Sequence, residues 1–139
     1  MSSDAAYLRA ALASQPAPVC FALIPFEIID ADRSEGFVRV EFAPQPAFGN
    51  HFGDIAGGFV VAMLDLPLSL AVFLKTDQFI PTVEIKTSFV GSARIGPCIT
   101  DGRVLRAGRA IVFAEARLWS ADGTLAAHAT ATSLRRSGE

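Results

Sequence analysis

Residues 55–74 form a long apolar segment in which Asp65 is the only ionisable side chain. A segment of this length and composition either spans a membrane or forms a helix that a protein core covers on nearly every side. A carboxylate near its centre opposes membrane insertion, because a charge in an apolar setting is costly unless it is paired, solvated or used. Pro67 lacks the N–H that a regular helix needs at that position. We therefore predict a buried central helix, kinked at Pro67, and no membrane partner.

Two adjacent glycines, Gly57 and Gly58, precede Asp65 by about two helical turns. The N–H groups in the first turn of a helix have no partner within the helix and can stabilise a developing negative charge. A donor site and a lone acid on one helix suggest a reaction centre. In the alternative, the glycines only permit close packing and Asp65 is a structural acid at a subunit interface. Asp54 is a rival acid that we expect to be solvated in a loop.

Alternating apolar and polar residues on both sides of the segment predict strands. The expected strands cover residues 26–32, 36–43, 82–90, 99–105, 110–119 and 125–134, and a short helix covers 4–13 with Ser3 or Asp4 as its N-cap. Short turns between neighbouring strands imply antiparallel pairing, and the small side chains of the last strand would let a helix lie close against it. We predict an α+β fold in which a curved antiparallel sheet wraps around one long central helix. Residues 1–139 form a single domain with a core from about 26 to 134.

The composition favours self-association and disfavours nucleic acid as a partner. Hydrophobic residues make up 51% of the 139 residues, which is high for a small monomer, so we expect a homo-oligomer. A formal net charge of -2 supplies no basic field for nucleic acid. Cys20 and Cys98 are too few and too far apart for a disulfide framework, so both are expected in the core in a reducing compartment. The N-terminus lacks a signal-peptide pattern, and we expect a cytoplasmic location.

Histidine and cysteine spacing predicts no metal site. Neither His51 nor His128 has a second histidine or a cysteine at the separation that a structural or catalytic metal needs. Both histidines are therefore expected to have structural roles.

The order and spacing of these features resemble those of the hotdog-fold thioesterases, in particular their PaaI-like, phenylacetate-degradation-related branch. The resemblance extends from about Phe26 to Leu134. The family pattern of Asn, Gly, His-Gly-Gly and Asp corresponds to Asn50, Gly53, Ala56-Gly57-Gly58 and Asp65, so that Ala56 stands where the family has histidine. Residues 82–96, 106–109 and 119–127 resemble the later strand, loop and hairpins of the family.

The resemblance implies hydrolysis of an acyl-CoA thioester in a site shared between two subunits. The N–H of Gly58 would polarise the thioester carbonyl, and Asp65 would act as general base or as nucleophile. Asn50 would orient water or the carbonyl, and Thr82 would donate a hydroxyl across the dimer. For Asn50 and Thr82 the alternatives are a plain turn residue and a plain strand residue. No cofactor is expected beyond coenzyme A as part of the substrate.

The residues themselves suggest how such a substrate would be held. Its expected binding residues are Gly57, Phe59, Arg94 and Arg109, the two arginines because guanidinium suits the phosphates of CoA. The acyl group is expected to be medium-chain or aromatic, in an apolar tunnel lined by Phe48, Phe52, Phe59 and Met63, although the same residues would serve equally as core. The assembly would be a homodimer, or a homotetramer built as a dimer of dimers.

Two other functions remain open at this stage. A hotdog module that binds acyl-CoA or a related ligand without hydrolysing it is the main alternative, and Ala56 in place of the family histidine motivates it. A hydratase on the same fold is disfavoured, because the sequence lacks the Asp and His pair that such relatives carry within one short loop.

Overall fold

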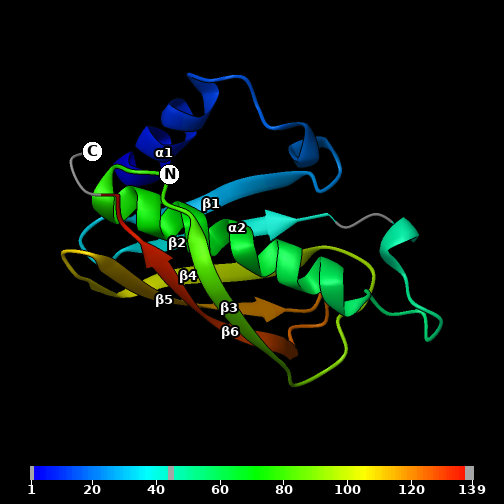
Figure 1. The fold of residues 1–139 in the computed structure, drawn as a ribbon. Coiled ribbons are helices and arrows are strands. Elements are labelled where there is room, and N and C mark those ends of the chain that lie inside the picture. The colour runs from blue at the N-terminus through cyan, green and yellow to red at the C-terminus, as the bar shows by residue number, and fades with distance from the viewer. Residues whose placement is uncertain (1, 44–45, 137–139) are drawn as a thin grey trace.

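The strands of this chain form one antiparallel sheet that curves around a single long helix (Figure 1). The strands are β1 (Phe26–Asp32), β2 (Phe37–Phe42), β3 (Thr82–Phe89), β4 (Cys98–Ala107), β5 (Ile111–Trp119) and β6 (Leu125–Leu134). In the computed structural model, which describes residues 2–43 and 46–136, they lie in the order β1-β2-β4-β5-β6-β3. The predicted α+β hotdog architecture is confirmed, and the strand ends differ from the expected ones by no more than about two residues.

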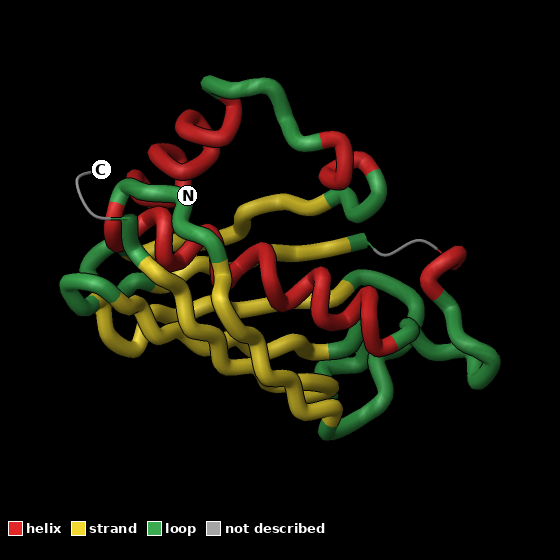
Figure 2. Tube along the Cα trace, in the orientation of Figure 1, coloured by secondary structure: helices red, strands yellow, loops and turns green. Residues whose placement is uncertain are grey.

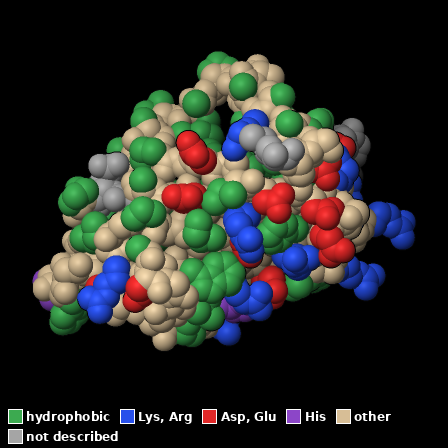
Figure 3. All heavy atoms as spheres, turned by 180° about the vertical axis from the view of Figure 1, so that it is seen from behind, with side chains coloured by type: hydrophobic (Ala, Val, Ile, Leu, Met, Phe, Trp, Pro, Cys, Tyr) green, Lys and Arg blue, Asp and Glu red, His purple; other side chains and the backbone are tan. Residues whose placement is uncertain are grey.

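One side of the sheet faces the long helix (Figure 2), and in β2, β5 and the first half of β4 buried residues alternate with more exposed ones. In β2, Val38 and Val40 are fully buried, whereas Arg39 between them forms a two-pronged ion pair with Asp101 of the neighbouring strand β4. Successive side chains of a strand point to opposite faces, so this pattern places the valines against the helix and the charges outside. Figure 3 shows acidic and basic side chains intermingled on the surface seen from behind.

The long helix α2 (Gly57–Thr76) lies mainly over β4 and β5 and is one continuous helix through Pro67. It begins two residues later than the apolar segment and ends at Asp77, whose left-handed backbone (φ 58°) stops the helix. It lies very close to the sheet at Gly102 of β4, where an added Cβ would lie 2.2 Å from the carbonyl oxygen of Pro67. We expected the small residues of β6 to serve this purpose, but the sheet curvature brings β4 beneath the helix instead.

By length and composition α2 would pass as a membrane span. The core helix of a water-soluble protein passes the same test, and 56% of the apolar window in α2 is buried within the chain. The sheet and the rest of the chain thus bury part of the helix, as predicted for a central helix of a protein core.

The N-terminal part of the chain lies beside β1 and then crosses back toward the sheet (Figure 1). Helix α1 (Ser3–Ala13) is followed by a short 3-10 helix η1 (Val19–Ala22), and a second one, η2 (Pro46–Phe48), precedes α2. The N-cap of α1 is Ser2, whose hydroxyl accepts a hydrogen bond from the N–H of Ala5 at 3.2 Å. The expected cap at Ser3 or Asp4 was wrong, because Asp4 instead accepts a hydrogen bond from the N–H of Arg33.

Candidate active site

Asp65 lies on the part of α2 that the sheet leaves uncovered, and it hydrogen-bonds the hydroxyl of Thr82 at the start of β3. Although the residue is exposed in the single chain, the apolar surroundings of its carboxylate raise its pKa, and the hydrogen bond from Thr82 opposes part of this rise. We expected Thr82 to reach the acid from a second subunit. The structure forms this contact within one chain, because the segment after α2 returns directly to β3.

The start of α2 presents free backbone donors next to open space. Within the described residues, no acceptor lies in hydrogen-bond reach of the N–H groups of Gly57 or Gly58, and the cap residue Ala56 contributes no side-chain bond. A Cβ added to Gly58 would meet nothing within 4 Å, whereas one added to Gly57 would lie 3.2 Å from the ring of Phe89. The two glycines therefore differ: Gly57 permits packing on β3, and Gly58 leaves a donor accessible from outside.

Gly58 and Asp65 lie on the same face of α2. They are seven positions apart in the sequence, about two helical turns, and both are exposed, as is Ala62 between them. The helix thus carries a free N–H and a carboxylate with a raised pKa along one uncovered strip. The N–H of Gly58 points along the helix axis toward the N-terminus, away from Asp65, and seven residues span about 10 Å, so one carbonyl can meet both kinds of group only if a second chain supplies one of them.

Asn50 organises the loop before α2. Its side-chain oxygen accepts hydrogen bonds from the N–H groups of Phe52 (2.9 Å) and Asp54 (3.2 Å), and its own N–H donates to the carbonyl of Asp54 at 2.7 Å. The amide oxygen is therefore already engaged within the loop, as the turn-residue alternative anticipates. A catalytic role for Asn50 stays a prediction.

Asp54 is not the solvated loop carboxylate that we expected. Its side chain is only 18% exposed, its Oδ1 is buried without a hydrogen bond, and the guanidinium of Arg94 lies 3.7 Å from that oxygen. The surroundings explain the difference, since Ile55 beside it is buried and its N–H is tied to the carbonyl of Ala93. Arg94 is thus placed near the start of α2, with 68% of its side chain exposed.

Arg109 does not join Arg94 in a single chain. Arg94 precedes β4 and Arg109 follows it in the exposed turn to β5, so the two lie at opposite ends of a ten-residue strand, about 30 Å apart. One CoA molecule could therefore contact both Arg94 and Arg109 only if they came from two different chains. Within one chain, a CoA molecule would contact one of the two arginines.

The four residues of the expected tunnel lie in different surroundings in the single chain. Phe48 and Met63 belong to the buried core, Phe52 is 80% exposed, and Phe59 stacks on Phe48 with ring centroids 4.1 Å apart. The stack of Phe48 on Phe59 packs η2 against α2, whereas Phe52 lies in the exposed loop between them.

A different apolar pocket of about 530 Å³ has Asp65 in its lining. It lies between α2 and the N-terminal part of the chain. Most of its lining residues are apolar, and they come from α1, the segment through η1 to Ile24, the ends of β1 and β2, and α2, among them Leu12, Phe21, Ile24, Phe26, Phe42 and Leu70.

Sequence reasoning missed the contribution of η1 to this pocket. Periodicity is the signal that identifies an element from sequence, and residues 19–24 show neither the strand period nor the helix period. Their continuous apolar character was the one available sign that they pack against other residues. Cys20 is exposed and lines the pocket, so its expected place in the core was wrong. Cys98 is buried as expected, and burial raises the pKa of its thiol to about 11.

Across residues 2–43 and 46–136, no group of three or more His, Cys, Asp or Glu side chains is placed to hold a metal ion. His128 instead lies 3.5 Å from Glu115 on the outer side of the sheet, and His51 packs beside Phe52.

Comparisons with solved structures place this arrangement among known proteins. A predicted thioesterase of Ralstonia eutropha, a phenylacetic acid degradation-related protein, is 27% identical, with 96% of this chain and all of that one covered and a TM-score of 0.83. The PaaI protein of the Escherichia coli phenylacetic acid degradation operon shares the fold at 17% identity and a TM-score of 0.84, over 99% of this chain and 96% of that one. A Streptococcus mutans protein crystallised with acetyl-CoA also shares it (20% identity, TM-score 0.72, 78% and 86% covered).

Comparisons of sequence give relatives of the same kind as the comparisons of structure. A predicted esterase of Saccharolobus solfataricus is 26% identical over 110 residues, which is 78% of this chain and 77% of that protein. The sequence model of the thioesterase superfamily matches residues 52–127, a stretch that includes the start of α2, Asp65 and Thr82. The chain therefore belongs to the thioesterase superfamily, with a hotdog fold similar to that of its PaaI-like, phenylacetate-degradation-related members.

Proposed function

We propose that this protein hydrolyses acyl-CoA thioesters, with Asp65 as the general base. The observation that carries the proposal is the uncovered strip of α2, where the free N–H of Gly58 and the carboxylate of Asp65 lie on one face beside an apolar pocket. Membership of the thioesterase superfamily and the fold shared with a protein crystallised with acetyl-CoA support acyl-CoA as the ligand. We propose a medium-chain or aromatic acyl group, because the pocket is apolar and contains several aromatic side chains.

In the proposed reaction, Asp65 accepts a proton from a water molecule as the water oxygen attacks the thioester carbon. The N–H of Gly58 from the second chain of a homodimer donates a hydrogen bond to the oxygen that becomes negatively charged, and one well-placed donor of this kind is worth about 3 kcal/mol. The tetrahedral intermediate then loses the C–S bond, and the proton held by Asp65 passes to the departing sulfur. The products are a carboxylic acid and free CoA. A raised pKa suits Asp65 to this task, because a stronger base accepts the proton more readily.

We further propose that the site works in a homodimer whose interface includes β3 and the uncovered strip of α2. Among the described strands, β3 is an edge of the sheet that pairs with β6 alone, and Val83, Phe89 and Val90 on or after it are more than half exposed. An edge strand with apolar side chains is a surface that natural proteins normally cover. A second copy placed along it would bring its own loops toward Asp65 and offer a position for the partner's arginines near the CoA phosphates.

The decisive experiment measures thiol release from a panel of acyl-CoA substrates with the wild type, Asp65→Asn and Asp54→Asn. We expect Asp65→Asn to lower kcat by about 100-fold or more, the usual contribution of a positioned general base, while the fold is retained by circular dichroism. Asp54→Asn is the matched control, since it removes the rival acid from the same region, and it should keep most of the activity. Full activity in Asp65→Asn would exclude this residue as the base.

The second candidate function is ligand binding without hydrolysis. The observation in its favour is Ala56, which gives the start of α2 a methyl group where the family carries a histidine. Under this alternative, isothermal titration with acyl-CoA shows binding, whereas thiol release stays at background for every substrate in the panel.

A further inference from the structure

The N-terminal part of the chain covers the apolar pocket without being held to it by hydrogen bonds. We call residues 14–24, from the end of α1 through η1, the arm. In the described part of the chain, every hydrogen bond of the arm runs within itself or to the end of α1, such as those from the N–H of Phe21 to Pro18 and of Leu23 to Cys20. Side-chain packing alone therefore holds the arm against α2 and the sheet. Segments held in this way move at low energetic cost.

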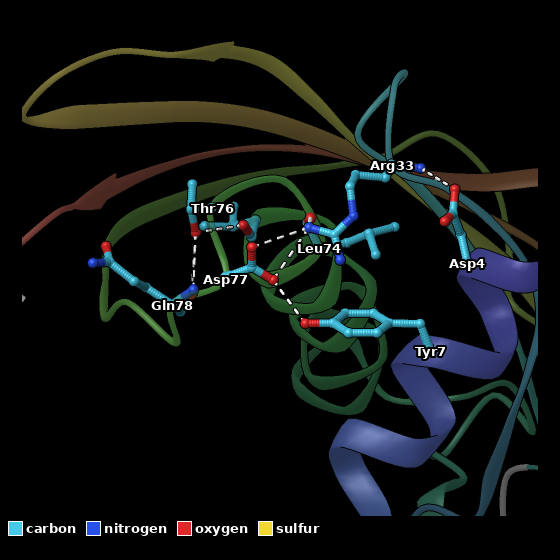
Figure 4. A network of polar contacts seen from close by, with 8 residues as sticks. Asp4, Tyr7, Arg33, Leu74, Thr76, Asp77 and Gln78 are labelled. Atoms are coloured by element: carbon cyan, nitrogen blue, oxygen red, sulfur yellow. Dashed lines mark hydrogen bonds and ion pairs between the residues drawn. The ribbon is translucent and has the colours of Figure 1, made fainter.

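The opposite end of α1 is firmly anchored. Asp77, which ends α2, accepts hydrogen bonds from the hydroxyl of Tyr7 at 2.8 Å and from the guanidinium of Arg33 at 3.1 Å (Figure 4). Arg33 also donates to the carbonyl of Leu74, and its backbone N–H donates to Asp4. This network joins α1, the turn between β1 and β2, and the end of α2. The arm thus extends from a fixed base and ends over the pocket.

The inner surface of the arm is suited to an apolar group. Phe21 packs edge-on against Phe26 with centroids 5.0 Å apart, and Phe26 contacts Phe42 at 6.0 Å, so three aromatic rings form a continuous wall. The carboxylate of Asp65 belongs to the same pocket. A volume of about 530 Å³ falls within the range of ordinary small-molecule sites.

We propose that this pocket receives the acyl group of the substrate and that the arm, through Cys20 and Phe21, determines which acyl groups fit. The proposal rests on the hydrolysis proposed above for Asp65. It adds a segment that determines substrate specificity and that lies outside the family pattern from Asn50 to Asp65. With the reacting carbonyl at Asp65, the acyl group extends under the arm, and a bulkier arm side chain shortens the space available to it.

The first test compares two tryptophan substitutions on neighbouring residues of the arm. Cys20→Trp fills the pocket, whereas Val19→Trp is the matched control, because Val19 is 91% exposed and is not part of the lining. We expect Cys20→Trp to lower kcat/KM for decanoyl-CoA relative to acetyl-CoA by about tenfold or more, since a change of about one methylene already matters that much in an apolar pocket. Val19→Trp should keep the wild-type ratio. Phe21→Ala should shift the preference toward longer or wider acyl groups.

The second test uses Cys20 as a reporter and does not depend on turnover. Cys20 is exposed in the pocket and Cys98 is buried with its pKa raised to about 11, so iodoacetamide at pH 8 should alkylate Cys20 alone in the folded protein. The ligand is a ketone analogue of decanoyl-CoA, in which a methylene separates the carbonyl from sulfur and prevents hydrolysis. We expect it to slow alkylation of Cys20 by about fivefold or more at saturation. CoA alone should leave the rate unchanged.

The two tests separate the acyl pocket from the hydrolysis. Protection of Cys20 by the analogue without any thiol release overturns the hydrolysis and leaves the pocket assignment standing. Thiol release with no protection, and with the same chain-length profile in Cys20→Trp and Val19→Trp, overturns the pocket assignment and leaves the hydrolysis standing. Absence of both thiol release and protection overturns both.

Discussion

At the scale of single residues, Asp65 is exposed to solvent, yet its carboxylate has apolar neighbours. Desolvation raises its pKa, and the hydrogen bond from Thr82 lowers it, so the two effects compete at one carboxylate. Thr82 in this arrangement is a positioning residue, because it acts on the proposed base and not on the substrate. The balance between the two effects is open to experiment.

Replacement of Thr82 by valine should move the acidic limb of the pH profile. Thr82→Val removes the hydrogen bond that favours the ionised carboxylate, so the pKa of Asp65 rises further and the acidic limb of kcat/KM shifts to higher pH. Thr82→Ser, which keeps a hydroxyl, should restore the wild-type limb. Measurement of kcat/KM from about pH 4 to 9 checks this. An unchanged limb in Thr82→Val, together with lower activity at every pH, would mean that Thr82 only shapes the strand.

The raised pKa of Asp65 also predicts a cost in stability. The folded state binds this proton more tightly than the unfolded chain, so the residue destabilises the fold as pH rises above the ordinary Asp value of 3.8 and through the raised pKa. Asp65→Asn lacks this cost, and its melting temperature should exceed that of the wild type at pH 7. Near pH 3, where both states are protonated, the difference should vanish. Thermal unfolding across this range makes the measurement, and a destabilised Asp65→Asn at pH 7 would contradict it.

At the scale of elements, the fold depends on how closely α2 approaches β4. A side chain at Gly102 would run into the backbone carbonyl of Pro67, and neither the helix nor the strand has a flexible side chain there to move aside. Gly102→Ala should therefore reduce the free energy of unfolding by about 1–3 kcal/mol or more, as overpacking does in other cores.

Gly58 offers a matched control for this prediction. A Cβ at Gly58 meets open space, so Gly58→Ala should retain wild-type stability or gain a few tenths of a kcal/mol from its higher helix propensity. Urea denaturation of both variants provides the comparison. Equal stability of Gly102→Ala and the wild type would mean that the helix moves away from β4 at little cost.

At the scale of the whole molecule, the sheet ends in two edges of unlike character. Strand β1 forms one edge and lies beside α1, whereas β3 forms the other edge and exposes Val83 and Phe89 by more than half. The apolar edge next to Asp65 is the one that we expect a second copy to cover. Dimer formation would then bury the apolar surface implied by the composition.

Charged substitutions on the two edges test the assembly. Val83→Lys should convert the dimer into a monomer at micromolar concentration, because it places an unpaired charge on the proposed interface. Ile29→Lys places the same charge on β1, where the side chain is 39% exposed, and should leave the dimer intact. Light scattering coupled to size-exclusion chromatography measures the mass of each. Equal effects of both substitutions, or a monomeric wild type, would exclude this interface.

The sequence by itself determined the elements and their order. It also determined that the proposed hydrogen-bond donor, Gly58, and the proposed base, Asp65, lie on the same helix. Periodicity determines which faces of the strands are buried, and the helical repeat alone places Gly58 and Asp65 on one side of α2. The sequence could not place Arg94 and Arg109 at opposite ends of β4, bury Asp54, or assign the pocket wall to Cys20 and Phe21 in place of the expected phenylalanines.

Those features depend on contacts between segments far apart in the chain, and local patterns carry no information about them. The arm is the clearest case, because its apolar residues follow no period, and only the curvature of the sheet and the anchor of α1 at Asp77 bring them over the acid. The sequence thus determined the central helix with its acid, and the tertiary structure decided which surface faces that acid.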